Sequence, residues 1–473
     1  MVELTSSLTA IVDALESRAI GATELLDAHL DRIERLDAEI NAVVTLAPDR
    51  ARTEAHAVDT ARTAGEPLGP LAGVPITVKD ALATAGIRST GGADELVDHV
   101  PTDDATVVST VRNAGALVFG KTNVPRWSGD YQSFNKLFGT TNNPWDLERT
   151  PGGSSGGPAA AVAMGFTGFE IGTDIGGGSI RVPASFCGIY GHKPSFGVIP
   201  TYGYLDSVRF HRNVSDVNVF GPMARSIDDL ELLFGLLAGP NPDDAPGWKL
   251  DLPPSRAEAI GDFRGAAWLD SDFAPIDPSV ATVLANATDA LERAGARIDH
   301  GRRPAIDATA AALNGSALIG LATRISDSDS PDGPEPPGAP VPHRQWDVRH
   351  RERGVVRRRW AEFFDEIDIL LCPVTPIPAF RHVHTDDGSN WTHAQIEEFG
   401  DLPYGQLVLW NSLIGSAYLP VTTPPVGYTA DGLPVGIQVV APYLHDRTAL
   451  TFARRITEVL GGYTPPPLAV DRP

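Results

Sequence analysis

Apolar and polar positions alternate along this chain with two different periods. Apolar residues that recur every three or four positions are typical of helices that bury one face, and short uninterrupted apolar runs are typical of buried strands. By these patterns we expect helices at residues 8–17, 23–35, 48–64, 106–114, 277–293, 344–364 and 447–460. We expect strands at residues 41–46, 71–78, 117–119, 367–372 and 435–440.

Strands and helices therefore alternate over most of the chain, which favours a largely buried sheet with helices packed against it. We predict an α/β fold with a mixed central β-sheet covered by helices on both faces, formed by residues 1–473 as a single domain. Residues 326–342 are low in complexity and rich in Ser, Asp, Pro and Gly. This segment is expected to be a mobile loop insertion, either a plain surface loop or a lid.

The net charge of the chain argues against certain classes of binding partner. There are 38 Lys and Arg residues against 60 Asp and Glu residues, which gives a formal net charge of −22. So acidic a chain is not expected to bind nucleic acid or an anionic membrane. The only two cysteines are Cys187 and Cys372, and the N-terminus lacks the basic start of a signal peptide, so a cytoplasmic protein is predicted. No apolar run approaches the ~20 residues that a transmembrane helix needs.

Two serine clusters set in glycine carry the candidate chemistry. The first is GGSSGG (152–157) and the second is DIGGGSIR (174–181). Glycine lets the backbone approach a reacting group closely, and consecutive amides in such a loop can bind an anion. Ser179 is therefore predicted to be a nucleophile. Its oxyanion hole would consist of the backbone amides of Ile175, Gly176, Gly177 and Gly178. The alternative is two glycine-rich turns around a buried helix.

A serine nucleophile needs a base. The usual partner is histidine, but His99 stands in an acidic stretch with no motif around it. Upstream, the apolar run 71–78 ends at Lys79. A lysine is a base only when it is neutral, and burial favours the neutral form. Taken alone, Lys79 is more simply interpreted as a surface charge or as the partner of Asp80.

These motifs resemble the amidase signature family, most strongly over residues 71–200. The matching segments are GVPITVKD (73–80), GKTNVP (120–125), FGTTNNPW (138–145), RTPGGSSGG (149–157), DIGGGSIRVP (174–183), FCGIYGHKP (186–194) and, more weakly, GLPVGIQ (432–438). In that family a lysine, a serine preceded by a cis peptide and a second serine form the catalytic triad. The resemblance implies the amidase signature fold, with Lys79 as a neutral base, Ser154 as a proton relay and Ser179 as the acyl acceptor.

One residue departs from the family pattern. The family has Asp-x-Gly-Gly-Ser, whereas this chain has one more glycine between Asp174 and Ser179. A glycine can be absorbed in a turn with little steric cost, but it bears on which amides face the substrate. Ser155, Asp174 and Arg181 are expected to support the loop structurally, with the two opposite charges holding its ends.

Aromatic-rich loops at residues 127–138 and 202–210 flank the serine region. Either loop is a candidate wall of an acyl or leaving-group pocket, and ordinary packing is the alternative. The candidate substrate contacts in these loops are Trp127, Tyr131, Tyr204 and Arg209.

Three other patterns are interpreted as coincidental. GALVFGKT (115–122) fits a phosphate-binding loop, but the predicted strand lies inside the loop positions. GGSSG (152–156) fits a nucleophile elbow, but no histidine stands in a recognisable setting downstream. His382 and His384 lie two apart in a polar loop without further ligands, so no metal site is predicted.

We therefore expect a hydrolase that cleaves an amide-type C–N bond of a small molecule through a seryl acyl-enzyme, without cofactor, as a monomer or homodimer. The substrate is a carboxamide or anilide; an ester or a urethane presents a similar carbonyl. The alternatives are a glutamine-using subunit of a tRNA-dependent amidotransferase, a serine hydrolase of another fold, and a non-enzymatic binder. Such amidotransferase subunits typically carry Gln where Val182 stands, which ranks that alternative second.

Overall fold

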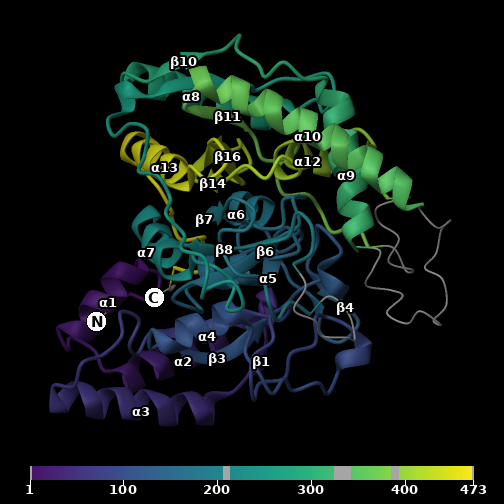
Figure 1. Ribbon diagram of the computed structural model, residues 1–473. Coiled ribbons are helices and arrows are strands. Elements are labelled where there is room, and N and C mark those ends of the chain that lie inside the picture. Colours follow the sequence, from purple (N-terminus) through teal and green to yellow (C-terminus); the bar gives the residue numbers. More distant parts are fainter. Residues whose placement is uncertain (1–2, 206–213, 324–341, 385–393, 471–473) are drawn as a thin grey trace.

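The computed structural model describes residues 3–205, 214–323, 342–384 and 394–470 (Figure 1). Two sequence predictions lie outside these ranges. One is Arg209 as a substrate contact, and the other is the loop insertion 326–342, of which only the final residue is described.

A large mixed sheet forms the centre of the molecule. Within the described residues it has nine strands, in the order β10-β9-β11-β16-β14-β7-β8-β6, with β15 paired to β16. The β10-β9 and β9-β11 pairs are parallel, and the others are antiparallel. The strands are β6 (Glu170–Asp174), β7 (Tyr190–Lys193), β8 (Val219–Ala224), β9 (Arg264–Ala267), β10 (Arg297–Asp299), β11 (Ile369–Pro373), β14 (Val421–Thr423), β15 (Pro425–Tyr428) and β16 (Pro434–Val440).

A smaller sheet lies beside the β6 end of the large one, at the bottom of Figure 1. Its order is β1-β3-β2, from β1 (Val43–Leu46), β2 (Pro75–Lys79) and β3 (Leu117–Thr122). β2 and β3 are parallel and completely buried, including their polar residues Thr77, Lys79, Lys121 and Thr122. β2 packs against β6, so the two sheets meet at the strand that carries Lys79.

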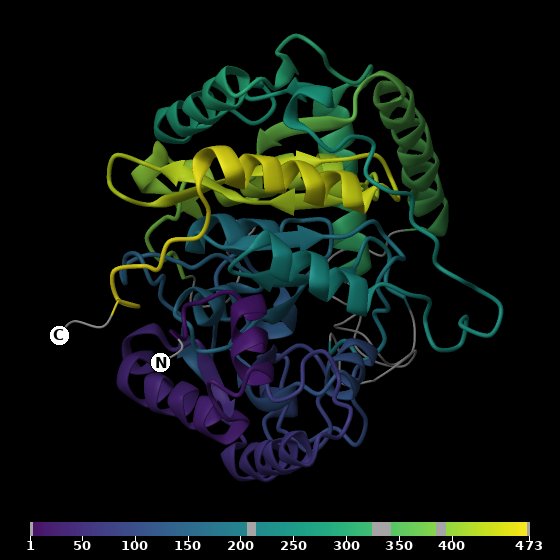
Figure 2. The ribbon, with the colours of Figure 1, turned by 90° about the vertical axis from the view of Figure 1, so that its left-hand side faces the viewer.

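Helices cover both faces of the large sheet, which confirms the predicted α/β class. α7 and α13 lie in front of the sheet in Figure 2, while α5 and α6 pack on β6, β7 and β16 from the other side. The helices are α1 (Leu8–Glu16), α2 (Ala22–Ile40), α3 (Pro48–Ala64), α4 (Thr106–Asn113), α5 (Gly156–Ala163), α6 (Arg181–Cys187), α7 (Ile227–Leu237), α8 (Pro278–Arg293), α9 (Ala308–Thr323), α10 (His343–Glu366), α12 (Leu409–Gly415) and α13 (Asp446–Leu460). No helix of the described residues combines the length and the apolar character needed to cross a membrane.

The element boundaries shift where the structure uses hydrogen bonds that periodicity does not show. The predicted strand 71–78 begins only at Pro75, because the amide of Val74 donates to the carbonyl of Leu71 in a turn. α2 extends past the predicted 23–35 and ends at Ile40, and the next residue, Asn41, caps it in a left-handed conformation. α8 begins as predicted, since the Asp277 carboxylate accepts from the amide of Ser279.

The structure of β3 does not fit a phosphate-binding loop at residues 115–122. Gly120, Lys121 and Thr122 continue the strand instead of opening a helix. The Lys121 amino group is completely buried and donates to the carbonyl of Leu82 (2.6 Å) and to the hydroxyls of Thr84 (2.7 Å) and Ser89 (2.9 Å). Lys121 is thus a structural residue that joins β3 to the segment after β2.

Lys121→Met should therefore destabilise the fold. The substitution leaves buried acceptors without their donor, and an unsatisfied buried group costs about 1–3 kcal/mol. Denaturant unfolding should show a lower free energy of unfolding, while the exposed Lys136→Met should change it little. Equal stabilities of the two variants, or an ATP-dependent rise in Tm of the unmodified protein, would contradict this structural role.

Candidate active site

Lys79 is the last residue of β2, and its side chain reaches toward the serine clusters. Its amino group lies 2.8 Å from Ser154 Oγ, 2.9 Å from Ser155 Oγ and 2.7 Å from Thr173 Oγ1. The structure thus brings Lys79 together with Ser154 and Ser155 of the first serine cluster, and also with Thr173, which the sequence did not indicate. Asp80 points elsewhere and accepts from the amide and hydroxyl of Thr90, so it is not the partner of Lys79.

The first serine cluster lies between β5 (Gly139–Thr140) and α5. The Gly153-Ser154 peptide bond is cis, as the family resemblance implied. The amide of Ser155 donates to the carbonyl of Ser179 (3.3 Å), which holds the two clusters side by side. The Ser155 hydroxyl lies within hydrogen-bond distance of the backbone of Thr173 on β6, consistent with a supporting role.

The protonation of Lys79 follows from its surroundings. The amino group is completely buried, and burial lowers its pKa to about 7, against a smaller raising effect of Asp174 and Glu170. Its three hydrogen-bond partners are neutral hydroxyls, and none is a carboxylate. A neutral amine donates two hydrogen bonds and accepts one. At neutral pH and above, one of these hydroxyls can therefore direct its hydrogen at the amine.

A buried ion pair closes the second serine cluster. Arg181 Nε lies 3.1 Å from Asp174 Oδ2, and both side chains are completely buried. Arg181 also donates to Gln438 Oε1 (2.8 Å), and the Asp174 carboxylate also accepts from the amides of Gly178 (3.0 Å) and Ile180 (3.2 Å). Arg181 and these donors outweigh burial and lower the pKa of Asp174 to about 2. The loop ends are thus joined directly.

The same contacts orient the glycine loop. In a trans peptide the C=O and the following N–H point in opposite directions. The Gly176 carbonyl accepts from Arg181 Nη2 (3.0 Å), so the amide of Gly177 points away from that pair. The next peptide is engaged at both ends, because the Gly177 carbonyl accepts from Tyr131 Oη and the Gly178 amide donates to Asp174. The amide of Gly178 is therefore not available as an oxyanion donor in this arrangement.

The additional glycine is accommodated against α12. Gly178 has a left-handed φ of +113°, and a Cβ there would lie 2.7 Å from the Asn411 side chain. One residue type fits both constraints, because only glycine adopts this φ readily and lacks the clashing atom. Gly176 is packed in the same way, since a Cβ on Gly415 would lie 2.3 Å from its carbonyl oxygen.

Ser179 lines a pocket of about 390 Å³. Within the described chain the Ser179 hydroxyl makes no hydrogen bond, although the residue is only 6% exposed. The other lining residues are Ser128, Gly129, Asp130, Tyr131, Ile175, Gly177, Ser316, Ile319, Gly320, Gly405 and Val408. The pocket is small and largely apolar, which suits an uncharged small-molecule group.

The structure separates the predicted substrate contacts. Tyr131 lines the pocket. Trp127 and Tyr204 are not among its lining residues: Trp127 packs against Gly91, and the Tyr204 ring lies 5.7 Å from that of Phe220. The sequence did not predict the pocket walls formed by Ile319 of α9 and by Val408, which directly precedes α12. Nothing in the sequence shows that these distant segments meet Ser179.

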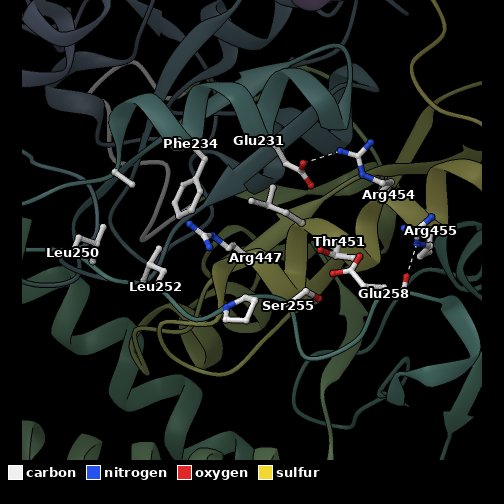
Figure 3. Close-up of a pocket in the computed structure, with 14 residues that line it drawn as sticks. Glu231, Phe234, Leu250, Leu252, Ser255, Glu258, Arg447, Thr451, Arg454 and Arg455 are labelled. Carbon is white, nitrogen blue, oxygen red and sulfur yellow. Dashed lines mark hydrogen bonds and ion pairs between the residues drawn. The ribbon is translucent and has the colours of Figure 1, made fainter.

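A larger pocket, of about 590 Å³, lies between α7 and α13, away from the serine clusters (Figure 3). Arg454 is paired there with Glu231 (2.8 Å), and Arg455 donates to the carbonyl of Glu258 (2.7 Å). The Ser255 hydroxyl donates to the carbonyl of Ala257 (2.6 Å). The described residues that line this pocket include no lysine or histidine beside a hydroxyl, so they do not provide a pairing of nucleophile and base.

Three histidines that the sequence analysis weighed or that follow the second cluster, His192, His382 and His384, have structural contacts. The His192 ring, which follows the second cluster, lies 3.0 Å from Thr422 Oγ1 and 3.3 Å from Asp446 Oδ1, completely buried. His382 Nε2 lies 3.0 Å from Asn142 Oδ1, and the His384 ring stacks on Phe134. In the described part of the chain no group of three or more His, Cys, Asp or Glu side chains is placed to hold a metal ion.

Comparison with known proteins places this chain in a family. The family model described as Amidase matches residues 24–331 and 342–450. The chain is 34% identical to the A-type subunit of glutamyl-tRNA(Gln) amidotransferase from Moorella thermoacetica, over 93% of this chain and 94% of that protein. A bacterial aryl acylamidase of the amidase signature family superposes with a TM-score of 0.84, at 26% identity over 99% of both chains. The corresponding amidotransferase protein of Thermotoga maritima shares the fold, with a TM-score of 0.78 at 24% identity over 98% of both chains.

The chain belongs to the amidase signature family. It is accordingly a hydrolase that acts on amide C–N bonds.

Asp174→Asn should lower both stability and activity, because it leaves the buried Arg181 guanidinium without its counter-charge. Breaking a buried pair from one side costs about 3–5 kcal/mol. Denaturant unfolding and turnover of the same preparation measure both effects. Glu54→Gln, which breaks an exposed pair with Arg50, is the matched control and should change neither. An Asp174→Asn variant with unchanged unfolding and turnover would show that the pair does not support the loop.

Proposed function

We propose that this protein hydrolyses small-molecule amides through an acyl-enzyme on Ser179, with Ser154 as proton relay and Lys79 as base. The observation that carries the proposal is the buried Lys79 amino group, which contacts Ser154 at 2.8 Å and whose hydrogen-bond partners among the described residues are all hydroxyls. Such an environment keeps a lysine neutral enough to accept a proton near neutral pH.

In the proposed acylation step, Ser179 Oγ attacks the carbonyl carbon of the substrate. Its proton passes to Ser154 Oγ, whose own proton passes to Lys79 Nζ, so that charge develops on the amine and on the substrate oxygen. Lys79 then returns the proton through Ser154 to the nitrogen, the C–N bond breaks, and the amine leaves. Water repeats the sequence on the acyl-enzyme and releases the acid.

The proposed oxyanion hole has fewer amide donors than the sequence suggested. The amides of Ile175, Gly176 and Gly177 make no hydrogen bond within the described chain, and the first and last of these residues line the pocket. The Gly178 amide is bonded to Asp174 instead. We therefore assign the stabilisation of the oxyanion to the amides of residues 175–177, beside Ser179.

The pocket favours an apolar acyl or aryl group next to the scissile bond. Tyr131, Ile175, Ile319 and Val408 supply an apolar wall around Ser179. The similarity to a bacterial aryl acylamidase supports an aryl amide or anilide as the first substrate to test. Esters and urethanes present a carbonyl to Ser179 in the same way and belong in the same screen.

A second candidate is the role of an amidotransferase subunit, which the 34% identity to the glutamyl-tRNA(Gln) amidotransferase protein of Moorella thermoacetica favours. Against it stands Val182, which is buried beside the nucleophile loop where such subunits typically carry Gln. The purified chain should hydrolyse an aryl amide without ATP or partner. Glutamine hydrolysis that requires added partner subunits, with no aryl amide turnover, would favour the second candidate.

Ser179→Ala should abolish amide turnover while leaving the thermal unfolding unchanged. Loss of a nucleophile that acts in a unit costs on the order of 10⁶ in kcat. A serine-directed fluorophosphonate followed by peptide mapping locates the reactive residue independently of any substrate. An adduct on Ser155, with Ser179 unmodified, would refute the assignment.

The pH dependence tests Lys79. The base must be neutral, so kcat/KM should rise with pH through about 7 and level off above it, following the lowered pKa of Lys79. Lys79→Ala should remove this rise and reduce amide turnover more than ester turnover, because an amine needs a proton to leave. The exposed Lys136→Ala is the control. If Lys79→Ala kept the wild-type profile and amide-to-ester ratio, Lys79 would not be the base.

A further inference from the structure

Glu170 on β6 is a completely buried carboxyl group that the proposed mechanism does not use. Its Oε1 accepts from the hydroxyls of Thr77 (2.7 Å) and Thr122 (2.9 Å). Its Oε2 accepts from the backbone amide of Lys79 (3.1 Å) and from that of Ile171 (3.2 Å). These four donors compensate the free energy that it costs to bury a carboxyl group without hydrogen-bond partners.

These contacts join the two sheets at the proposed base. Thr77 and Lys79 belong to β2, Thr122 belongs to β3, and Glu170 belongs to the edge strand of the large sheet. The bond to the Lys79 amide fixes the backbone from which the lysine side chain starts. On the same strand β6, Thr173 holds the other end of that side chain at 2.7 Å.

We propose that Glu170 is a positioning residue for Lys79, which fixes the end of β2 from which the lysine side chain starts. The proposal deepens the function proposed above and rests on Lys79 as the base. It assigns Glu170 no contact with substrate.

The charges around both groups decide the sign of the effect. The charged groups that act on Lys79 are Asp174 and Glu170, both on β6, and each raises its pKa against the lowering by burial. Burial raises the pKa of Glu170 itself to about 7, while Lys121 on β3 lowers it. The hydroxyls of Ser154, Ser155 and Thr173 that contact the amine are neutral. Since an anion stabilises the ammonium form, removal of the Glu170 charge should lower the pKa of Lys79.

Glu170→Gln removes the charge with little change of shape. The chain has only five lysines, Lys79, Lys121, Lys136, Lys193 and Lys249, so lysine-selective ¹³C labelling gives few signals to titrate by NMR. The Lys79 signal is assigned by its loss in Lys79→Ala. We expect its titration midpoint to fall by about one pH unit in Glu170→Gln. The exposed Lys136 and Lys249 should titrate as in the wild type.

A matched control removes a different buried carboxylate. Asp80 acts on Lys121 and is not among the charges that act on Lys79. Asp80→Asn should therefore move the Lys121 midpoint and leave that of Lys79 in place. Should Glu170→Gln fail to fold, Thr122→Val removes one hydrogen bond to the carboxylate and favours its neutral form. The Lys79 midpoint should then fall in the same direction, by less.

Kinetics separates this inference from the function on which it rests. The rise of kcat/KM with pH should move to lower pH in step with the Lys79 midpoint. An unchanged Lys79 midpoint in folded Glu170→Gln, or in Thr122→Val if that is the variant that folds, overturns the inference and leaves the proposed function standing. A lowered midpoint without any movement of the kinetic profile overturns Lys79 as the base, and the positioning role falls with it.

Discussion

The burial of one amino group among hydroxyls is the constraint on which the candidate site depends. The Lys79 side chain is placed where water does not reach and where, in the part of the chain that the structure describes, no carboxylate contacts its nitrogen. Burial lowers the pKa of Lys79 because it disfavours the charged amine, and the nearby anions Asp174 and Glu170, which do not contact the amine, partly offset this lowering. A completely buried strand carries the amine, and the first serine cluster and Thr173 provide its hydrogen-bond partners.

The loop after β6 meets a different requirement, which is rigidity. Its peptide groups are fixed by a buried ion pair, by Tyr131 and by close packing against α12. The ion pair and Tyr131 occupy the carbonyls of Gly176 and Gly177 and the amide of Gly178. The amides left over are those proposed to bind the oxyanion. The additional glycine is thus taken up on the α12 side of the loop, and the residue after it still opens into the pocket.

Much of this arrangement could be predicted from the sequence. Hydrophobic periodicity located most of the main helices and strands, and the glycine-set serines with Lys79 marked the site, because these features are local or repeat a family pattern. The walls of the pocket could not be predicted, since Ile319 and Val408 come from segments whose meeting is decided only by tertiary packing. Trp127 and Tyr204 were named for their aromatic character alone, and local packing places them away from the pocket. The contacts of Glu170 with β2 could not be predicted from the sequence, because an isolated carboxyl in an apolar strand does not indicate its partners.

Because the site is divided between two sheets, the proposed catalysis requires that the two sheets have packed together. Lys79 arrives on the three-stranded sheet, whereas Ser179 and its loop extend from the nine-stranded one. A chain in which each sheet is formed but the two have not yet joined would hold the proposed base and nucleophile apart. The proposed activity would then arise only with the last step of assembly, so that a half-folded chain is chemically silent toward the amide bonds around it.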